Sequence, residues 1–566
     1  MLRARTKDDP RTGIPKYMGL SGRQLGLAVS IVATNGFLLF GYDQGVMSGI
    51  ISAAPFNNAF PETKNNSTWQ AFVTAIYEVG CLLGAIWQLS TGDTIGRRRA
   101  IILGGVIMII GVIVQVSAIP GHGATAQFIV GRTITGIGNG INTSTIPTYQ
   151  AECSRTTNRG LLICIEGGII AFGTLIAYWI DFGAHFAYNT PDLTWRFPIA
   201  FQVVFGLFLS LAMIWLPESP RWLMTRDRHE EAVGVLAALA GKPRDDEEVQ
   251  LQFNVIQESI RISGHAGGNT PYRALLTGGK TQHFRRVMLG VSSQFFQQIG
   301  GCNAVIYYLP VLFKESIFVS NDNKEFLSLL LGGVNQIVYA AFATVSWFII
   351  ERVGRRKLFL IGSAGQCLSM VLAFACLIPQ ALKGNDDPSA QNAAKGAAVG
   401  LFTYIAFFGA TWLPLPWLYP AEINPIKTRA KANAVSTCSN WLWNFAVVMF
   451  TPPMLSGIGW GTYLFFAVCN ACFIPIIYFF YPETAGRSLE EIDLIFAKGY
   501  QENISYVTAA KQLPKLTDAE IEAMGKELGV GSDEEFNADR DIEKADSLGE
   551  KDSGSESGVA RQDFSN

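Results

Sequence analysis

The sequence predicts an all-α membrane protein with twelve transmembrane helices, arranged in two six-helix halves with short cytoplasmic helices between them. Three observations predict this class. The chain of 566 residues is 49% hydrophobic and only 16% charged, whereas soluble domains carry roughly 25% charged residues. Twelve apolar runs have about the length, roughly 20 residues, that crosses a bilayer. Similar motifs recur at matching positions in the two sets of six runs.

The apolar runs define the organisation of the chain. The first six lie near 25–51, 69–90, 100–119, 126–148, 161–180 and 197–216, and the second six near 286–313, 327–350, 358–380, 396–419, 432–455 and 461–481. The predicted parts are an N-terminal cytoplasmic segment at 1–24, a first half at 25–216, a helical linker at 217–285, a second half at 286–481 and a cytoplasmic tail at 482–566. The linker contains amphipathic segments. The tail is polar and acidic, which favours a largely disordered segment.

Basic residues predict the orientation of the helices. They cluster in the loops on one side, at 96–99, 351–357 and 427–431, whereas the alternate loops hold scattered cations. Because cytoplasmic loops are enriched in Lys and Arg, we expect both termini and the linker in the cytoplasm. The segment 52–68 is then outside, where Asn65 and Asn66 begin two overlapping glycosylation sequons. A chance match to the sequon is the alternative.

The two halves repeat each other at three places. DTIGRRR follows the second run and ERVGRRK the eighth, PTYQAECSRTTNRG the fourth and YPAEINPIKTRA the tenth, and PESPRWL the sixth and PETAGRSLEEID the twelfth. Such a parallel duplication is typical of transporters whose halves enclose a site near the bilayer midplane. We interpret the acids and arginines of these loops as a cytoplasmic gate that holds the halves together when the inner side is shut; simple positive-inside anchoring is the alternative. The gate residues are Asp93, Arg97, Glu152, Arg159, Glu351, Arg355, Glu422 and Arg429.

One carboxylate interrupts the first apolar run. Asp43 lies in GYDQGVMSG, within 25–51. An acid at membrane depth costs a few kcal/mol unless it is paired or protonated. Its simplest function is therefore to bind and release a proton, and a permanent structural ion pair is the alternative.

Several motifs together resemble the signature of the sugar porter family within the major facilitator superfamily. They are the paired GRR loops, PESPRWL, QQIGGCNAVIYY and PETAGRSLEEID, and the similarity covers about 25–495. A closer set, comprising FGYDQGVMSGI, NTSTIPTYQAE, IAYWIDFG, STCSNWLWNFAVVMFTP and YPETAGRSLEEIDLIFAK, resembles the fungal sugar transporter-like glycerol–proton symporters. The resemblance implies a major facilitator fold, alternating access across twelve helices and both termini in the cytoplasm.

The resemblance also implies roles in proton coupling. Asp43 matches the first-helix acid of sugar–proton symporters, and Arg132, in GRTITGIGNG on the fourth run, is its implied partner. A buried arginine needs a counter-ion, so the two residues account for each other. We expect competitive pairing, in which protonation of Asp43 frees the pair and permits loading from outside. Glu166 is a second intramembrane acid, either a proton or substrate ligand or a partner of a neighbouring helix.

The implied substrate site lies between the halves. Amides both donate to and accept from hydroxyl groups, and indole faces pack against C–H groups, so the set suits a neutral polyhydroxyl compound. No cluster of basic residues faces the site, which disfavours an anionic substrate. For each amide, interhelical hydrogen bonding is the alternative role. The set comprises Gln297, Gln298, Asn303, Asn335, Trp417, Asn440 and Trp441.

Two departures from the hexose-carrier pattern bear on the substrate. Gly167 replaces the usual glutamine of the fifth run, and in GATWLPLPW Gly409 replaces the usual acid, with bulkier residues after it. Because a site that loses hydroxyl partners discriminates strongly, both changes favour a smaller polyol, although Gly167 also opens space. We expect a plasma-membrane proton symporter for a small neutral polyol, with glycerol first. The alternatives are a hexose–proton symporter, a passive facilitator and a transporter-like nutrient sensor.

Other functional classes are disfavoured by the motifs that the sequence lacks. It contains no nucleophile–base constellation, metal-ligand spacing or phosphate-binding loop, so we expect neither an enzyme nor a cofactor, and transport would be driven by the proton gradient. The nine cysteines are interpreted as buried spectator thiols. The expected partners are the substrate, protons and the lipid bilayer, and no nucleic acid.

Overall fold

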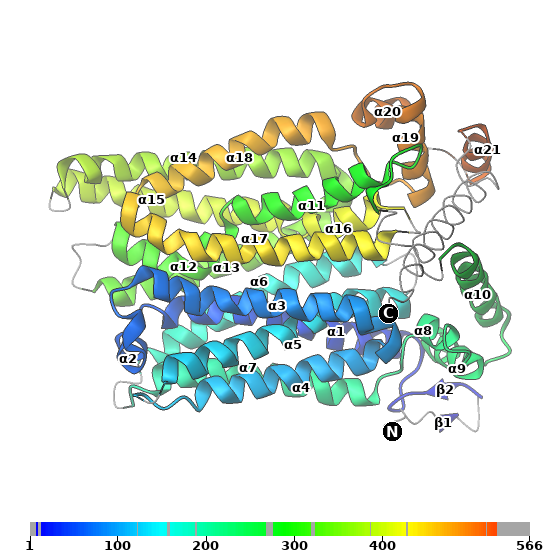
Figure 1. Ribbon diagram of the computed structural model, residues 1–566, viewed down its shortest axis with the longest axis horizontal. Coiled ribbons are helices and arrows are strands. Elements are labelled where there is room, and N and C mark those ends of the chain that lie inside the picture. Colours follow the sequence, from blue (N-terminus) through cyan, green and yellow to red (C-terminus); the bar gives the residue numbers. More distant parts are fainter. Residues whose placement is uncertain are drawn as a thin grey trace, which may run out of the picture.

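The protein is an elongated bundle of nearly parallel helices (Figure 1). The computed structural model describes residues 7–8, 13–121, 123–154, 159–186, 190–267, 275–317, 323–384, 387–425, 428–514, 516 and 518–528.

The bundle consists of two six-span halves that lie side by side (Figure 1). The first half contains α1 (Gly22–Ile50), α3 (Ser67–Ile95), α4 (Arg97–Val116), α5 (Ala124–Cys153), α6 (Arg159–Ala184) and α7 (Leu193–Trp215). The second contains α11 (His283–Ile299) with α12 (Cys302–Leu312), α13 (Lys324–Val353), α14 (Arg355–Lys383), α15 (Pro388–Phe407) with α16 (Leu415–Ile423), α17 (Arg429–Ile458) and α18 (Gly461–Phe480). The predicted twelve-helix membrane fold is confirmed.

Two spans of the second half are broken near their middle. Between α11 and α12 the chain turns at Gly301, whose φ of 99° favours glycine and where a side chain would collide with the ring of Phe466. Between α15 and α16 lies η5 (Phe408–Trp412), a π-helical turn, followed by Pro414. Broken helices at membrane depth leave backbone groups free to line a cavity. Both breaks lie beside the central cavity described below.

The three least apolar spans each bury polar side chains. Within the described part of the chain, nine helical segments are each long and apolar enough to cross a membrane. The spans outside that set are α5, α17 and the broken pair α11–α12, which hold Arg132, Asn440 and Gln297 away from solvent. In contrast, many large apolar side chains on the outer helix faces are exposed, as a lipid-facing surface requires. These include Leu27, Ile31, Leu83, Ile86, Val204, Leu207, Leu211, Phe348, Leu368, Val468 and Phe479.

Short elements cap the two ends of the bundle. At one end, here called the linker end, lie α8 (Pro220–Met224), α9 (His229–Ala240), α10 (Glu247–Gly267), α19 (Leu489–Gln501), α20 (Tyr506–Gln512), α21 (Asp518–Leu528) and the antiparallel pair β1 (Lys7–Asp8) and β2 (Pro15–Lys16) (Figure 1). At the opposite end, here called the far end, lie α2 (Ala54–Ala59) and η1 (Pro61–Thr63).

The tail contains more structure than its polarity predicts. Leu494 and Ile495 of α19, alanines of α20 and Leu513, which directly follows α20, bury a small apolar cluster, against which the apolar side chains of α21 pack. The expectation of a largely disordered tail is therefore wrong for 489–512 and 518–528, because a few apolar residues at helical spacing suffice to hold the helices. Residues 529–566 lie outside the described part.

The repeated loop motifs make equivalent contacts in the two halves. After α7, Glu218 accepts hydrogen bonds from the backbone N–H groups of Arg98 and Ser219, both at 3.0 Å, and the Ser219 hydroxyl donates to Glu152 at 2.5 Å. Burial raises the pKa of the Glu218 carboxyl, and these backbone hydrogen bonds oppose the shift. The acid of PESP therefore fixes the start of α4 against the end of α7.

The second half reproduces this arrangement. Glu483 accepts from the backbone N–H groups of Arg355 at 2.7 Å and Arg356 at 3.2 Å, and the Thr484 hydroxyl donates to Glu422 at 2.6 Å. The same acid–hydroxyl pair, in PES and PET, thus makes the same bonds. The internal repeat seen in the sequence corresponds to a repeated structural unit.

Candidate functional site

A buried ion pair joins α1 and α5 in the first half. Asp43 Oδ1 lies 3.6 Å from Arg132 Nη1, and neither side chain is exposed. This separation is too long for a hydrogen bond, and both Asp43 oxygens and Arg132 Nη1 lack hydrogen-bond partners within the described structure. The two residues are therefore held together by charge but are not locked by directional bonds.

Arg132 lies along one face of α3. Its Nη2 donates to the carbonyl oxygen of Thr74 at 3.4 Å, and its guanidinium sits 4.7 Å from the ring centroid of Tyr77. Residues three and four apart share a helix face, so Glu78, four residues after Thr74, lies on the same face. The guanidinium therefore has one acid on the α1 side and another on the α3 side.

Glu78 is a buried acid that the sequence analysis did not single out. It is completely buried and lies within electrostatic range of both Asp43 and Arg132. Its Oε1 accepts a hydrogen bond of 2.5 Å from the hydroxyl of Tyr307, which belongs to α12 in the second half. We call Asp43, Glu78 and Arg132 the charge cluster. The signal that would have found Glu78 is the one that found Asp43, an acid inside an apolar run.

Glu166 does not belong to the charge cluster. It lies on α6, is 2% exposed, and its Oε1 has no hydrogen-bond partner within the described structure. A role for Glu166 in proton binding stays a prediction.

A small cavity lies between the halves beside the charge cluster. Its volume is about 20 Å³, and a cavity of about 10–15 Å³ on this measure holds a single water molecule. Its lining includes five of the predicted substrate residues, together with side chains from α1 and α6 of the first half. The lining residues are Phe40, Gln44, Ile170, Gln297, Gln298, Cys302, Asn303, Ile306, Tyr339, Phe408, Leu413, Trp417 and Asn440.

The first amide network connects α11, α17 and the break before α16. Gln297 Nε2 donates to the carbonyl oxygen of Trp412 at 2.9 Å. Asn440 Nδ2 donates to Gln297 Oε1 at 3.1 Å and to Gln294 Oε1 at 2.5 Å. The amides thus bond to one another and to a backbone carbonyl at the helix break. The hydroxyl groups of a polyhydroxyl compound also donate and accept hydrogen bonds, so such a compound could replace these bonds between the amides.

A second amide network lies toward the charge cluster. Asn303 Nδ2 donates to Gln298 Oε1 and, at 2.6 Å, to Asn444 Oδ1. Asn444 also faces the Glu78 carboxyl. The substrate amides and the charge cluster are therefore linked through neighbouring side chains.

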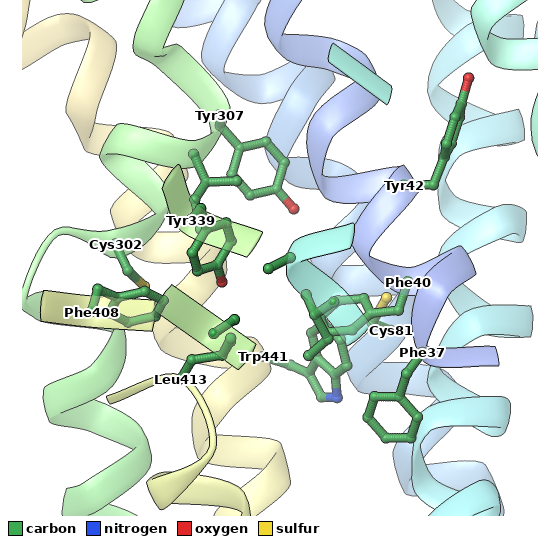
Figure 2. Packing of buried hydrophobic residues seen from close by; sticks show 14 of the residues in the cluster. Phe37, Phe40, Tyr42, Cys81, Cys302, Tyr307, Tyr339, Phe408, Leu413 and Trp441 are labelled. Carbon is green, nitrogen blue, oxygen red and sulfur yellow. The ribbon is translucent and has the colours of Figure 1, made fainter. Parts of the chain in front are cut away.

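Aromatic side chains close the cavity on the α1 side. Phe40 lies edge-on to Trp441, with ring centroids 5.2 Å apart, and Phe37 lies edge-on to Trp417 at 6.4 Å. Figure 2 shows Phe40 and Trp441 together, with Tyr339, Phe408 and Leu413 on the opposite side. Both aromatic contacts join the first half to the second, so in this conformation the cavity is covered.

Two predicted substrate residues do not line the cavity. Asn335 on α13 is buried, and its Nδ2 donates to the carbonyl oxygen of Leu401 on α15 at 3.5 Å. Trp441 is buried behind Phe40. The geometry places Asn335 in a contact between helices of the second half, which was the alternative role for each amide, and places Trp441 as a second layer of the wall.

Gln44 and Tyr339 line the cavity but were not singled out from the sequence. Gln44 directly follows Asp43 inside the first apolar run, so its polarity there was a usable signal. Tyr339 has room beside η5 because Gly409 has no side chain; a Cβ at 409 would lie 3.1 Å from the Tyr339 ring. This contact between Gly409 and Tyr339 is visible only in the three-dimensional structure.

The predicted gate residues form ion pairs at the linker end. Arg97 Nε lies 3.2 Å from Glu152 Oε2, and Arg355 Nη2 lies 2.7 Å from Glu351 and 2.6 Å from Glu422. Each pair joins helices of the same half. These pairs therefore brace each half separately in this conformation.

Three further residues complete the predicted gate. Arg429 donates to the carbonyl oxygen of Asn424 at 3.3 Å, beside the start of α17. The side chains of Asp93 and Arg159 lie outside the described residues. The gating role of the whole set stays a prediction.

Comparison with known proteins agrees with this architecture. The family described as "Sugar (and other) transporter" matches residues 28–496. The chain belongs to this family. It is a sugar porter of the major facilitator superfamily, and it is a transporter and not an enzyme.

The sugar porter relatives are similar over almost the whole chain. The chain is 45% identical to "Sugar transporter STL1" of Saccharomyces cerevisiae, covering 97% of this chain and 96% of that protein. It is 44% identical to "Major facilitator superfamily transporter mfsA" of Aspergillus fumigatus, covering 91% and 94%. The E. coli proton:xylose symporter XylE, solved with 6-bromo-6-deoxy-D-glucose, superposes with a TM-score of 0.68 at 25% identity, covering 83% of this chain and 99% of XylE.

The cavity lining predicts that Asn440 contacts the substrate of this sugar porter and that Asn335 does not. We expect Asn440→Ala to raise KM about tenfold, because one lost hydrogen bond is worth about 1–1.5 kcal/mol. The same substitution at Asn335 should change KM little, because that side chain bonds to α15. Labelled-substrate uptake at varied concentration measures both. An equal rise in KM for the two variants would contradict the assignment from the cavity lining.

Proposed function

We propose that the protein is a proton symporter that imports a small neutral polyol, with glycerol first, by alternating access. The observation that carries the proposal is the fully buried Asp43–Arg132 pair, which lies beside an amide-lined cavity between the two halves. A buried acid that can exchange its guanidinium partner for a proton can couple proton movement to substrate transport, and this coupling requires no cofactor.

The cavity supports a neutral and compact substrate. Its polar lining consists of amides and the hydroxyl of Tyr339, with no ionised side chain among the lining residues. Leu413, one of the bulkier residues of the tenth span, narrows it. At about 20 Å³ the covered site must widen for any polyol, and a small polyol requires the smallest movement. The resemblance of motifs to the glycerol–proton symporters supports the same substrate.

A hexose–proton symporter is the second candidate. It is favoured by the likeness to XylE, which was solved with a bromodeoxyglucose. Glycerol and glucose can be separated directly in cells that lack their own carriers for both. Labelled glycerol uptake that excess unlabelled glucose does not reduce is the expected result. Strong inhibition by glucose, with labelled glucose itself accumulated, would favour the hexose.

We further propose a location in the plasma membrane with the linker end in the cytoplasm. Arg97, Arg355 and their basic neighbours lie at this end, and cytoplasmic ends of spans are enriched in such residues. The exposed sequon residues Asn65 and Asn66 lie near α2 at the far end. Protease protection of a tag at the C-terminus in intact cells is expected, whereas digestion of that tag from outside would reverse the orientation.

A further inference from the structure

The charge cluster holds one more acid than the proton-coupling pair requires. Asp43 and Glu78 are both fully buried and share a single buried guanidinium, that of Arg132. With both acids ionised, the cluster carries one net negative charge away from water, which is costly. Binding of one proton to an Asp43 oxygen makes the cluster neutral and leaves Arg132 in need of a new counter-ion.

Glu78 is placed to become that counter-ion. Arg132 already lies on the α3 face that carries Thr74 and Tyr77. Its Nε and Nη1 have no hydrogen-bond partner, and neither has Glu78 Oε2, within the described structure. A rotation of the guanidinium toward Glu78 would therefore bring free donors to a free acceptor.

Glu78 also connects the cluster to the other half. The Tyr307 hydroxyl donates to its Oε1 at 2.5 Å, and Tyr307 belongs to α12 of the second half. In Figure 2 the Tyr307 hydroxyl points away from its own helix. A hydrogen bond to an ionised carboxylate is about twice as strong as one between neutral groups. Pairing of Glu78 with Arg132 would leave the carboxylate ionised but draw its charge toward α5, which weakens this contact between the halves.

The surroundings of Glu78 contain no second cation among the described residues. The titratable and charged groups that face it are Asp43 from α1, Tyr77 and Cys81 from α3, Arg132 from α5, and Tyr307 and Tyr308 from α12. From α17 it faces the uncharged amide of Asn444. Arg132 is thus the group that both acids compete for.

We propose that Glu78 is the residue that transmits protonation of Asp43 to the second half, by taking Arg132 from Asp43 and weakening its own bond to Tyr307. The only covalent change is the binding of one proton to Asp43. The contact between α3 and α12 then loosens. The inference rests on proton binding at Asp43, as proposed above. It assigns Glu78 a coupling role that is separate from substrate binding.

The far end of the bundle offers a direct readout of this contact. Ser67, at the start of α3, and Ser456, near the end of α17, lie in different halves with their hydroxyl oxygens 3.3 Å apart. Two cysteines at this spacing can form a disulfide after a small adjustment. Cross-linking of the double variant Ser67→Cys/Ser456→Cys therefore reports how often the far end is closed, and it needs no substrate.

The experiment compares disulfide cross-linking of the full-length double-cysteine protein at neutral and acidic pH under an added copper oxidant. Because acid protonates thiols and slows disulfide formation in every variant, each rate is expressed relative to that of the Tyr307→Phe variant of the same protein at the same pH. The intramolecular bond is detected after cleavage at a protease site inserted between α10 and α11. In the otherwise unchanged protein we expect acid to lower this relative rate by about tenfold, the effect of weakening one charge-assisted bond. Adding Glu78→Gln, which cannot draw Arg132 and offers Tyr307 a neutral acceptor, should give a lower relative rate that is the same at both pH values.

Two tyrosine variants provide a matched control. Tyr307→Phe removes the bond between the halves, so its cross-linking should be slow at neutral pH and should follow the chemistry of the thiols alone as the pH falls. The adjacent Tyr308 donates to the carbonyl oxygen of Val448 within its own half, at 3.0 Å, and also interacts with Thr74 on α3. Because it is Tyr307 that donates to Glu78, Tyr308→Phe should keep the pH response.

The outcomes separate this inference from the proposed function. A pH response that disappears in Asp43→Asn but persists unchanged in Glu78→Gln would overturn the role of Glu78 and leave proton binding at Asp43 intact. No pH response in the starting double-cysteine protein, at full cross-linking competence, would overturn both. Loss of the response in Glu78→Gln, with a relative rate that stays above one at both pH values, supports the inference and shows that the variant is folded.

Discussion

Asp43→Asn is expected to abolish accumulation of the substrate while leaving exchange of substrate across the membrane. Asparagine matches aspartate in size, so the packing between α1 and α5 is preserved, but it cannot carry a proton or hold Arg132 by charge. The proton gradient then has no group through which to act, and the internal concentration should rise only to passive equilibration. Counterflow of labelled substrate in proteoliposomes, which needs no gradient, should persist.

The matched control for this variant is Asp181→Asn. Asp181 is another buried acid, at the end of α6, and its Oδ2 accepts from the backbone N–H of Gly49 at 3.2 Å, a bond that an amide oxygen can replace. It has no contact with Arg132 within the described structure, so accumulation should continue. Accumulation that survives in Asp43→Asn would show that Asp43 is a structural partner of Arg132 and that the proton binds elsewhere.

Arg132→Gln is expected to have the largest effect on stability. Removing the guanidinium leaves Asp43 and Glu78 buried without a cation, and breaking a buried pair in this way typically costs about 3–5 kcal/mol. We expect loss of transport together with a sharp fall in the amount of folded protein, measured by thermal unfolding in detergent. Glu78 makes the loss more severe than a simple pair would.

The double variant Asp43→Asn/Arg132→Gln distinguishes charge from shape. It removes one positive and one negative group, so it should recover much of the thermal stability that Arg132→Gln loses. It should not recover accumulation, because no proton acceptor returns at position 43. If the double variant were less stable than Arg132→Gln, the stabilising role of the Asp43–Arg132 interaction would be refuted.

The spans and the internal repeat were predictable because they depend on local composition. Apolar runs of bilayer length located all twelve spans, and the recurrence of PES and PET predicted a duplication that the Glu218 and Glu483 contacts confirm. The helices of the tail were not predicted, since a few apolar residues, such as Leu494 and Leu513, hold them in a strongly polar sequence.

The site was predictable in part. Asp43 and Arg132 were predicted because charged residues are rare inside membranes and because of a family resemblance, and the structure brings the two residues together. Asn335 was placed in the substrate set by resemblance alone, and its bond to α15 depends on the rotation of α13, which no single residue encodes. Glu78, like Asp43, is an acid inside an apolar run, but it does not belong to any of the family motifs. Its link to Tyr307 joins residues 229 positions apart and is visible only in the fold.

The most direct test of proton-coupled polyol import is the pH of a weakly buffered suspension of cells that express this chain. Addition of glycerol is expected to make the medium more alkaline, because each substrate molecule that enters takes protons from outside. The change should be absent with Asp43→Asn and with glucose as the added compound. Uptake of labelled glycerol without any change in external pH would contradict proton coupling and show a facilitator.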